Sequence, residues 1–150
     1  MIRPLLTTDL DHLLDIEQHS FPKSPYSRAT LIHLYWLYAD TFWVYVDQPD
    51  GQGKEEVCGY LIFSRDGHLI SLAVHPTYRR RGIGETLIKR AMETLSEKKM
   101  WAEVRRGNQG ARAFYQKMGF QIVGILPNYY GKEDALIVEF LEGSRVPGNP

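Results

Sequence analysis

The fold is decided by one segment of this 150-residue chain, residues 71–88, which read SLAVHPTYRRRGIGETLI. An apolar, strand-like run ends at Val74, a polar turn follows, and the glycines Gly82 and Gly84 open an amphipathic helical pattern. Glycine lets a ligand approach the backbone closely, and the first N–H groups of a helix point outward without internal partners. Because the helix dipole also attracts negative charge at this end, the segment is typical of an anion-binding strand–turn–helix unit.

Two common phosphate-binding motifs do not match this segment. A P-loop carries a lysine and then Ser or Thr after its second glycine, whereas Glu85 and Thr86 follow Gly84 here. A dinucleotide-binding fingerprint needs a third glycine at position 87, which is Leu87. Two interpretations remain open: a general diphosphate cradle, and a solvated basic turn with a glycine at a tight helix start.

The composition indicates a single globular domain without a basic field. A length of 150 residues suits one hydrophobic core, and 43% hydrophobic with 24% charged residues is ordinary for a globular protein. Lysine plus arginine and aspartate plus glutamate number 18 each, so the formal net charge is zero. A dedicated nucleic-acid binder usually carries a basic excess. We therefore expect no nucleic-acid partner and interpret the arginines at 79–81 as a local feature.

The cysteine and histidine content argues against disulfides and metal sites. Cys58 is the only cysteine, which excludes an intrachain disulfide. The five histidines are scattered, without metal-ligand spacing to Cys58, so we expect no metal. The chain starts without the apolar core of a secretion signal and has no apolar run of membrane-spanning length. We therefore expect a cytoplasmic protein with no membrane partner, present as a monomer or weak homodimer.

Hydrophobic periodicity and turn residues predict the element order β-α-α-β-β-β-α-β-α-β-β. Helices are expected from Thr8, from Ser27, over residues 82–98 and from Asn108. Strands are expected over residues 2–6, 41–46, 57–65, 68–74, 100–104, 121–126 and 135–141. This mixture predicts an α/β fold, of the α+β type with a mixed sheet and helices on both faces. We expect residues 142–150 to form a disordered tail.

Three separate motifs resemble those of the GNAT superfamily of N-acetyltransferases. Residues 71–88 resemble its acetyl-CoA motif, Arg/Gln-x-x-Gly-x-Gly/Ala, and residues 102–120, AEVRRGNQGARAFYQKMGF, resemble its next motif. Residues 128–140, NYYGKEDALIVEF, are similar to the end of its N-terminal acetyltransferase branch. The element order also matches the GNAT fold, so the resemblance implies one GNAT domain over residues 1–141. Within the superfamily it is strongest to the ribosomal-protein alanine and archaeal general N-terminal acetyltransferases.

The resemblance implies that acetyl-CoA is the cofactor and coenzyme A a product. It assigns the pyrophosphate to backbone N–H groups around the glycine pair, and the pantetheine arm to the strand before it. Some of the arginines are candidates for the 3′-phosphate, and at least one is expected to be a solvated bystander. The side chains of the strand residues equally suit a core, and Asn108 equally suits a plain helix cap. The implied cofactor-binding set is Leu72, Ala73, Val74, Arg79, Arg80, Arg81, Gly82, Ile83, Gly84, Glu85, Asn108 and Tyr115.

The resemblance also implies acid–base chemistry at three side chains. Tyr115 occupies the place of the family's general acid, which protonates the departing CoA thiolate; a core aromatic is the alternative. Glu103 is the candidate general base, with a salt bridge to Arg105 or Arg106 as the alternative. His68 is a further base candidate that can share a water with Glu103, although a lone histidine at a hairpin end is more often a surface residue.

Two aromatic loops are the expected peptide-binding surface. Residues 20–27, SFPKSPYS, resemble the substrate loop of the N-terminal acetyltransferase branch, and the tyrosine pair at 129–130 resembles its opposing loop. Lys23 departs from the family pattern, which carries Glu, Val or Trp there, and its charge would repel an incoming ammonium unless it turns to solvent. The candidate contacts are Phe21, Pro22, Lys23, Tyr26, Tyr129 and Tyr130.

The resemblance therefore predicts direct acetyl transfer from acetyl-CoA to the α-amino group of a protein N-terminus. An α-amino group has a pKa near 8, against roughly 10.4 for lysine, so a weak base acting through water suffices to deprotonate it. Two other functions stay open. The first is acetylation of small-molecule amines or lysine side chains by the same fold, and the second is a non-catalytic CoA- or peptide-binding module.

Overall fold

The computed structural model describes residues 1–48, 51 and 53–142. The chain divides into two compact units. Unit 1 consists of Met1–Ser64 and Ser71–Ala91, and unit 2 takes in Arg65–Ile70 and the chain from Met92 onward. The expected tail at 142–150 lies outside the described residues except for Glu142. Among the described residues, no helix is both long enough and apolar enough to cross a bilayer.

Unit 1 is built on a four-stranded sheet with the order β1–β2–β3–β4. Strand β1 (Ile2–Pro4) pairs antiparallel with β2 (Phe42–Asp47), which pairs antiparallel with β3 (Glu56–Phe63). Strand β3 is buried along nearly its whole length, as expected of a strand covered on both faces, and β4 (Leu69–Val74) lies beside it. A side chain at Gly59 would lie 2.8 Å from the carbonyl oxygen of Ala73, so glycine permits this close approach of β3 to β4.

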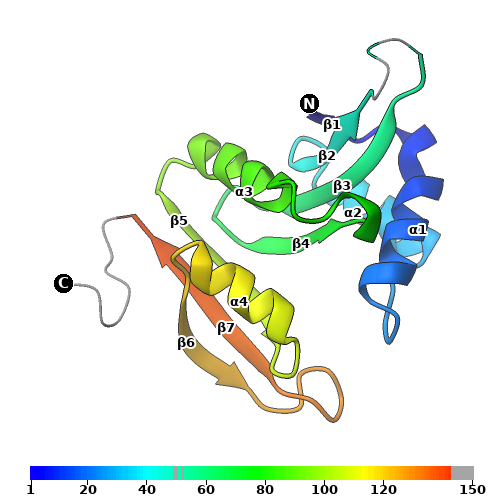
Figure 1. The fold of residues 1–150 in the computed structure, drawn as a ribbon. Coiled ribbons are helices and arrows are strands. Elements are labelled where there is room, and N and C mark those ends of the chain that lie inside the picture. Colours follow the sequence, from blue (N-terminus) through cyan, green and yellow to red (C-terminus); the bar gives the residue numbers. More distant parts are fainter. Residues whose placement is uncertain (49–50, 52, 143–150) are drawn as a thin grey trace. The chain divides into compact units, whose positions relative to one another are not determined.

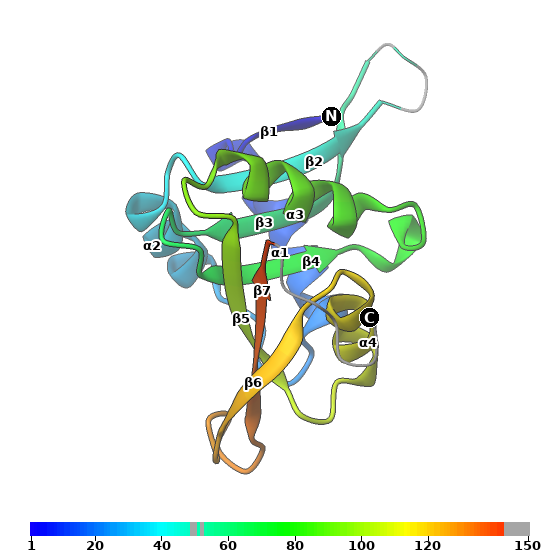
Figure 2. The same cartoon turned by 90° about the vertical axis from the view of Figure 1, so that its left-hand side faces the viewer.

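Helices cover both faces of this sheet. Helices α1 (Leu10–Ser20) and α2 (Arg28–Leu37) lie on one face, and α3 (Ile83–Thr94) lies on the other (Figures 1 and 2). The buried residues of α3 recur at helical spacing, as the apolar pattern predicts, and α2 begins at the expected cap, Ser27. The first helix begins later than expected, at Leu10, because the 3-10 turn η1 (Thr7–Asp9) precedes it.

Unit 2 contains a three-stranded antiparallel sheet with the order β5–β7–β6. Its strands are β5 (Lys99–Arg105), β6 (Gln121–Leu126) and β7 (Ala135–Leu141), and α4 (Gln109–Lys117) covers one face (Figures 1 and 2). The helices and strands of the two units confirm the predicted fold class and element order. Helix α3 ends at Thr94 rather than at 98, and the Nζ of Lys98 donates to the carbonyl oxygens of Met92, Glu93 and Leu95 at 3.2, 3.0 and 2.9 Å.

Candidate functional site

The glycine motif of unit 1 forms a loop with left-handed residues at the start of α3. Gly82 has φ 73° and Arg80 has φ 66°. The left-handed region costs a residue with a side chain about 1–2 kcal/mol, so Arg80 holds a strained conformation. The loop passes directly into α3, where the Thr86 N–H donates to the Gly82 carbonyl oxygen at 2.9 Å and the side chain of Ile83 is buried. The side chain of Ile83 is therefore not available to a ligand.

The three arginines before the glycine pair have different surroundings. Arg79 folds back on unit 1, because its Nε donates to the Val74 carbonyl oxygen at 3.1 Å and its Nη2 lies 3.4 Å from the Ser20 Oγ. The guanidinium of Arg81 lies 5.3 Å from the ring centroid of Tyr78. No hydrogen bond or ion pair joins Arg80 to another residue that the structure describes. The Nη1 of Arg81 also lies 4.0 Å from the Asp47 Oδ2, which partly compensates its charge. Arg80 is consequently the best placed of the three to give its charge to an anion.

The remaining cofactor candidates of unit 1 lie on β4 and in the first turn of α3. Ala73 is buried, whereas its neighbours Leu72 and Val74 are half-buried, as alternation along β4 requires. Gly84 lies in the first turn of α3. Glu85 forms an ion pair with Lys89 at 2.8 Å, one helical turn further on. The expected binding of the cofactor by the backbone of this motif stays a prediction.

His68 and Glu103 meet in unit 2, although 35 residues separate them in the chain. The His68 Nε2 lies 2.8 Å from the Glu103 Oε2, and the two side chains are 32% and 21% exposed. The segment before β4 is fixed against β5, since the Trp101 N–H donates to the Gly67 carbonyl oxygen at 3.0 Å. The imidazole of His68 also stacks on Trp101 with 5.3 Å between ring centroids. Glu103 follows Trp101 by two residues and therefore points to the same face of β5.

The hydrogen bond between these side chains changes the pKa of both. Its presence lowers the pKa of Glu103 and raises the pKa of His68, while partial burial opposes each shift. The carboxylate is thus ionised at neutral pH, and the imidazole keeps a proton to a higher pH than usual. The two arginines that could have competed for Glu103 have other partners: Arg105 lies 3.0 Å from Glu133, and Arg106 lies 3.1 Å from Asp134.

Tyr115 lies on α4 of unit 2 with only 8% of its surface exposed. Its ring makes edge contacts with Phe114 and Phe120, with centroids 5.3 and 5.1 Å apart. Burial raises the pKa of this phenol well above its usual value, and the nearby Tyr130 and Glu103 raise it further. Tyr115 therefore packs as a core aromatic and at the same time keeps its proton at neutral pH.

The loop between β6 and β7 carries the tyrosine pair of unit 2. Tyr129 is 53% exposed, and Tyr130 lies under the guanidinium of Arg105, 4.1 Å from the ring centroid. Glu133 fixes this loop by three contacts: it pairs with Arg105, accepts from the Gly107 N–H at 2.9 Å, and its carbonyl oxygen accepts from the Tyr130 N–H at 3.0 Å. Glu133 has no sequence signal that would have singled it out, because a single acid in a polar loop has no distinguishing pattern.

The other expected site residues lie at the ends of helices. Asn108 caps α4, with its Oδ1 accepting from the Ala111 N–H at 3.0 Å. The loop after α1 leaves Pro22 and Lys23 exposed, whereas Phe21 and Tyr26 are half-buried. The exposed position of Lys23 is compatible with its charge turning to solvent.

The sequence of this chain matches a known protein family. Residues 10–120 match the model of the Acetyltransferase (GNAT) family. The chain belongs to the GNAT family. It is an acetyl-CoA-dependent N-acetyltransferase, as its relatives are.

Two relatives and one solved structure match this GNAT enzyme over nearly their whole length. A candidate ribosomal protein bS18-alanine N-acetyltransferase of Bacillus subtilis (strain 168) is 36% identical over 143 residues, which cover 91% of this chain and 92% of the relative. An N-alpha-acetyltransferase of Sulfurisphaera tokodaii is 32% identical over 157 residues, covering 91% of this chain and 90% of the relative. The crystal structure of Ard1 from Thermoplasma volcanium has a TM-score of 0.79 at 27% identity, covering 94% of this chain and 96% of Ard1.

In the glycine loop of this GNAT enzyme, binding of the acetyl-CoA pyrophosphate stays a prediction. A side chain added at Gly82 would meet nothing within 4 Å, so the space beside this backbone is open. The arginine charges and the N-terminus of α3 both favour an anion in that space. The donors are backbone N–H groups and guanidinium groups, which are the usual partners of phosphate oxygens.

Substitution of Gly82 by alanine tests this loop. We expect Gly82→Ala to raise the KM for acetyl-CoA by roughly tenfold, because alanine at φ 73° costs about 1–2 kcal/mol and shifts the loop away from its binding conformation. Gly51→Ala is a matched control, since Gly51 has φ 66° and equally open surroundings. Steady-state kinetics with varied acetyl-CoA measure the effect. Equal KM values for acetyl-CoA in the two variants would show that the loop is not part of the cofactor site.

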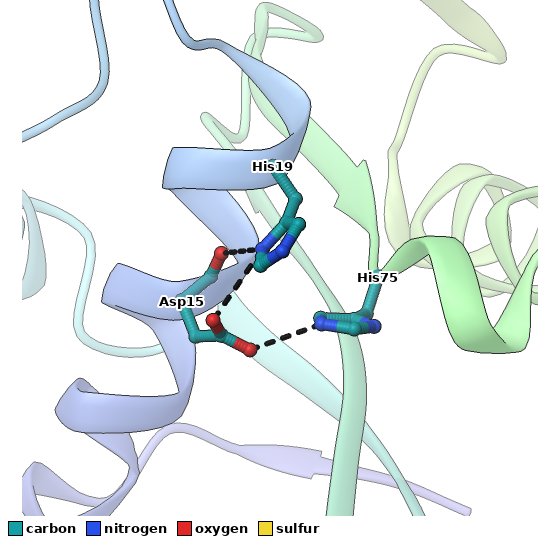
Figure 3. A group of neighbouring side chains, drawn as sticks. All are labelled: Asp15, His19 and His75. Atoms are coloured by element: carbon teal, nitrogen blue, oxygen red, sulfur yellow. Dashed lines mark hydrogen bonds and ion pairs between the residues drawn. The ribbon is translucent and has the colours of Figure 1, made fainter.

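A further cluster of titratable side chains lies on unit 1 (Figure 3). The His19 Nδ1 lies 2.8 Å from the carbonyl oxygen of Asp15 and 3.4 Å from its carboxylate, and the His75 Nε2 lies 3.0 Å from the same carboxylate. The Thr77 N–H donates to the His75 Nδ1 at 3.2 Å, so neutral His75 carries its proton on Nε2 and donates it to Asp15.

This proton arrangement decides what the cluster can do. The ligand atoms of Asp15, His19 and His75 lie within 4.8 Å of one another, a spacing that a metal ion could use after adjustment. Metal binding through the His75 Nε2 would, however, move the proton to Nδ1, where it would face the Thr77 N–H. The cluster is therefore a hydrogen-bonded clamp between α1 and the 3-10 turn η2 (Pro76–Tyr78).

Proposed function

We propose that this enzyme transfers the acetyl group of acetyl-CoA directly to the α-amino group of a protein N-terminus. The observation that carries the proposal is the half-buried His68–Glu103 pair, 2.8 Å apart, which is a weak base accessible to solvent. The names of the relatives agree with it, because one refers to the alanine of a ribosomal protein and another to N-alpha-acetylation. A cytoplasmic location and a monomeric or weakly dimeric state remain predictions.

The proposed chemistry divides between proton acceptance and proton donation. Acetyl-CoA supplies an activated acetyl thioester when it is bound. The Glu103 carboxylate, with His68 hydrogen-bonded to it, accepts a proton from the substrate's α-ammonium group through a water molecule. The free amine then attacks the acetyl carbonyl carbon, so that a C–N bond forms, the thioester C–S bond breaks and the nitrogen releases a second proton to solvent. The buried hydroxyl of Tyr115 donates a proton to the leaving sulfur. Backbone N–H groups near Val74 polarise the acetyl carbonyl group, and no covalent enzyme intermediate is needed.

The pKa values of the participants favour an α-amine over a lysine side chain. A carboxylate whose pKa is lowered is a weak base, so it acts best on an amine that already loses its proton near neutral pH. An α-amino group meets this condition with a pKa near 8, whereas a lysine amine at roughly 10.4 is deprotonated about 250 times more rarely near neutral pH.

A peptide panel tests the substrate class. We expect peptides with free N-termini beginning Ala, Ser, Thr, Gly or Met to be acetylated at least tenfold faster than the same peptides with a blocked N-terminus and an internal lysine. Polyamines and amino sugars serve as small-molecule amines. Mass spectrometry locates the acetyl group, and varying residues one and two defines the preference.

Other outcomes of the panel would change the assignment. Turnover of only the small amines or only the internal lysine would contradict the proposal. Either result would favour an acetyltransferase for small-molecule amines or lysine side chains. Binding of coenzyme A, measured by calorimetry, without turnover of any amine would favour a non-catalytic module.

A further inference from the structure

Glu17 is a buried carboxylate of unit 1 that the proposed chemistry does not use. It lies on α1 with 1% of its surface exposed. The hydroxyl of Tyr60 on β3 donates to its Oε2, and the backbone N–H of Tyr26 donates to its Oε1 at 2.7 Å. Burial raises the pKa of Glu17, whereas the hydrogen bonds from Tyr60 and Tyr26 lower it. A buried carboxylate is costly unless such donors satisfy it, so these contacts offset the cost of burying Glu17.

The contacts of Glu17 link two functional segments of unit 1. Tyr26 belongs to the candidate peptide-contact loop, residues 21–26. The Tyr60 hydroxyl lies 2.8 Å from the Ser71 Oγ, and Ser71 immediately precedes the strand residues expected to bind the pantetheine arm. A continuous chain of hydrogen bonds therefore runs from Tyr26 through Glu17 and Tyr60 to Ser71.

Glu17 also holds both ends of the peptide-contact loop. At the start of the loop, the Phe21 N–H donates to the Glu17 carbonyl oxygen at 2.8 Å. At its end, the Tyr26 N–H donates to the Glu17 side chain, and Ser27 then caps α2 by accepting from the Thr30 N–H at 3.1 Å. One residue thus closes the loop with its backbone and its side chain, so replacement of the side chain releases only the far end.

We propose that Glu17 is a positioning residue that sets the conformation of the peptide-contact loop and thereby the affinity for the peptide substrate. This inference rests on the proposed function, because the loop contacts a peptide only if the enzyme acetylates one. Glu17 does not act on the reacting atoms. Its removal should therefore raise the KM for peptide and leave the KM for acetyl-CoA unchanged.

Three substitutions separate positioning from general stability. Glu17→Leu removes the acceptor of the Tyr26 N–H, and Glu17→Gln keeps an oxygen at that place. Tyr60→Phe keeps the bond between Glu17 and Tyr26 but breaks the link to Ser71, so it destabilises the same buried network without releasing the loop.

The expected results differ among the three variants. We expect Glu17→Leu to raise the peptide KM roughly tenfold, the effect of losing one hydrogen bond to a charged group. Glu17→Gln and Tyr60→Phe should stay within about twofold of the wild type, and all three should keep the KM for acetyl-CoA within about twofold. Kinetics with an Ala-first peptide, together with unfolding temperatures, give these values.

Amide hydrogen exchange of residues 21–27 gives a readout that does not depend on activity. Exchange should accelerate in Glu17→Leu but not in Glu17→Gln or Tyr60→Phe. The inference is overturned if peptide KM follows the unfolding temperature across all three variants, or if exchange in Glu17→Leu equals that of the wild type. If the wild type acetylates no peptide, the proposed function fails, and the exchange result still decides whether Glu17 holds the loop.

Discussion

Glu103→Gln is expected to lower kcat/KM for a peptide substrate by roughly a hundredfold to a thousandfold, the contribution typical of a general base. The amide keeps an oxygen that can accept from His68, so the pair stays together while the proton acceptor is lost. The measurement is steady-state kinetics with the best peptide of the panel. Glu139→Gln on β7 of the same unit is the control, because Glu139 is half-buried but has no assigned role.

A small effect of this substitution would count against the proposed base. If Glu103→Gln and Glu139→Gln both retain more than about a third of the wild-type kcat/KM, then Glu103 is a structural residue. In that case His68→Gln decides whether the imidazole is the acceptor by itself. A large loss in Glu103→Gln with unchanged binding of coenzyme A places the defect in the proton transfer.

The Glu103–His68 pair should also make stability depend on pH. The pKa of His68 is raised in the folded protein. The stabilisation of the fold by protonated His68 is therefore complete below the ordinary pKa of 6.5, and it is lost as the pH rises through the pKa of the folded protein. The pKa of Glu103 is lowered, so its contribution is complete above 4.5 and is lost as the pH falls. Glu103→Gln should therefore lower the free energy of unfolding most between pH 4.5 and 6.5, by under about 1 kcal/mol because solvent screens the half-exposed pair.

Tyr115→Phe is expected to lower kcat by roughly a hundredfold while the unfolding temperature changes little. Phenylalanine keeps the ring contacts with Phe114 and Phe120, and only the proton donor is removed. Because burial raises the pKa of Tyr115, its ionisation should cause no loss of kcat up to about pH 9.5 in the wild type.

Tyr45→Phe is the matched control for the loss of a hydroxyl. Tyr45 is half-buried on β2, in unit 1, and has no proposed role. Unchanged kcat in both Tyr→Phe variants would show that Tyr115 is only a core aromatic. A loss of kcat that accompanies a large fall in unfolding temperature would instead point to a packing defect.

Residues 71–88 show how far the sequence predicts the fold. The strand, the turn and the start of the helix depend on interactions within a few residues, so periodicity and the glycine pair predict them correctly. The end of α3 was predicted too late, at 98, because the apolar pattern continues beyond Thr94 while Lys98 turns back to bind the last carbonyl oxygens. A pattern of apolar residues predicts which face of a helix is buried, but it does not predict where a lysine side chain binds the last carbonyl oxygens and the helix ends.

The candidate site shows a different limit. The resemblance to the GNAT family singled out Glu103, His68 and Tyr115 one by one. The competing interpretation of Glu103, a salt bridge with Arg105 or Arg106, could be resolved only after the partners of both arginines in the loop at 127–134 were known. Glu17 had no sequence signal beyond its place on a helix. The residues of its hydrogen-bond network lie far apart in the chain: Tyr26 in a loop, Tyr60 on β3 and Ser71 on β4.

By itself, the sequence determined the order of helices and strands and the resemblance to the GNAT family. These properties reside in local patterns, since glycine conformation, capping and periodicity act over a few residues. Only the tertiary structure decided that His68 pairs with Glu103, that Glu17 holds Tyr26, and that Asp15 clamps His19 and His75. Such pairs depend on which strand lies beside which and in what register, and the free energy that selects a register is shared among many distant contacts.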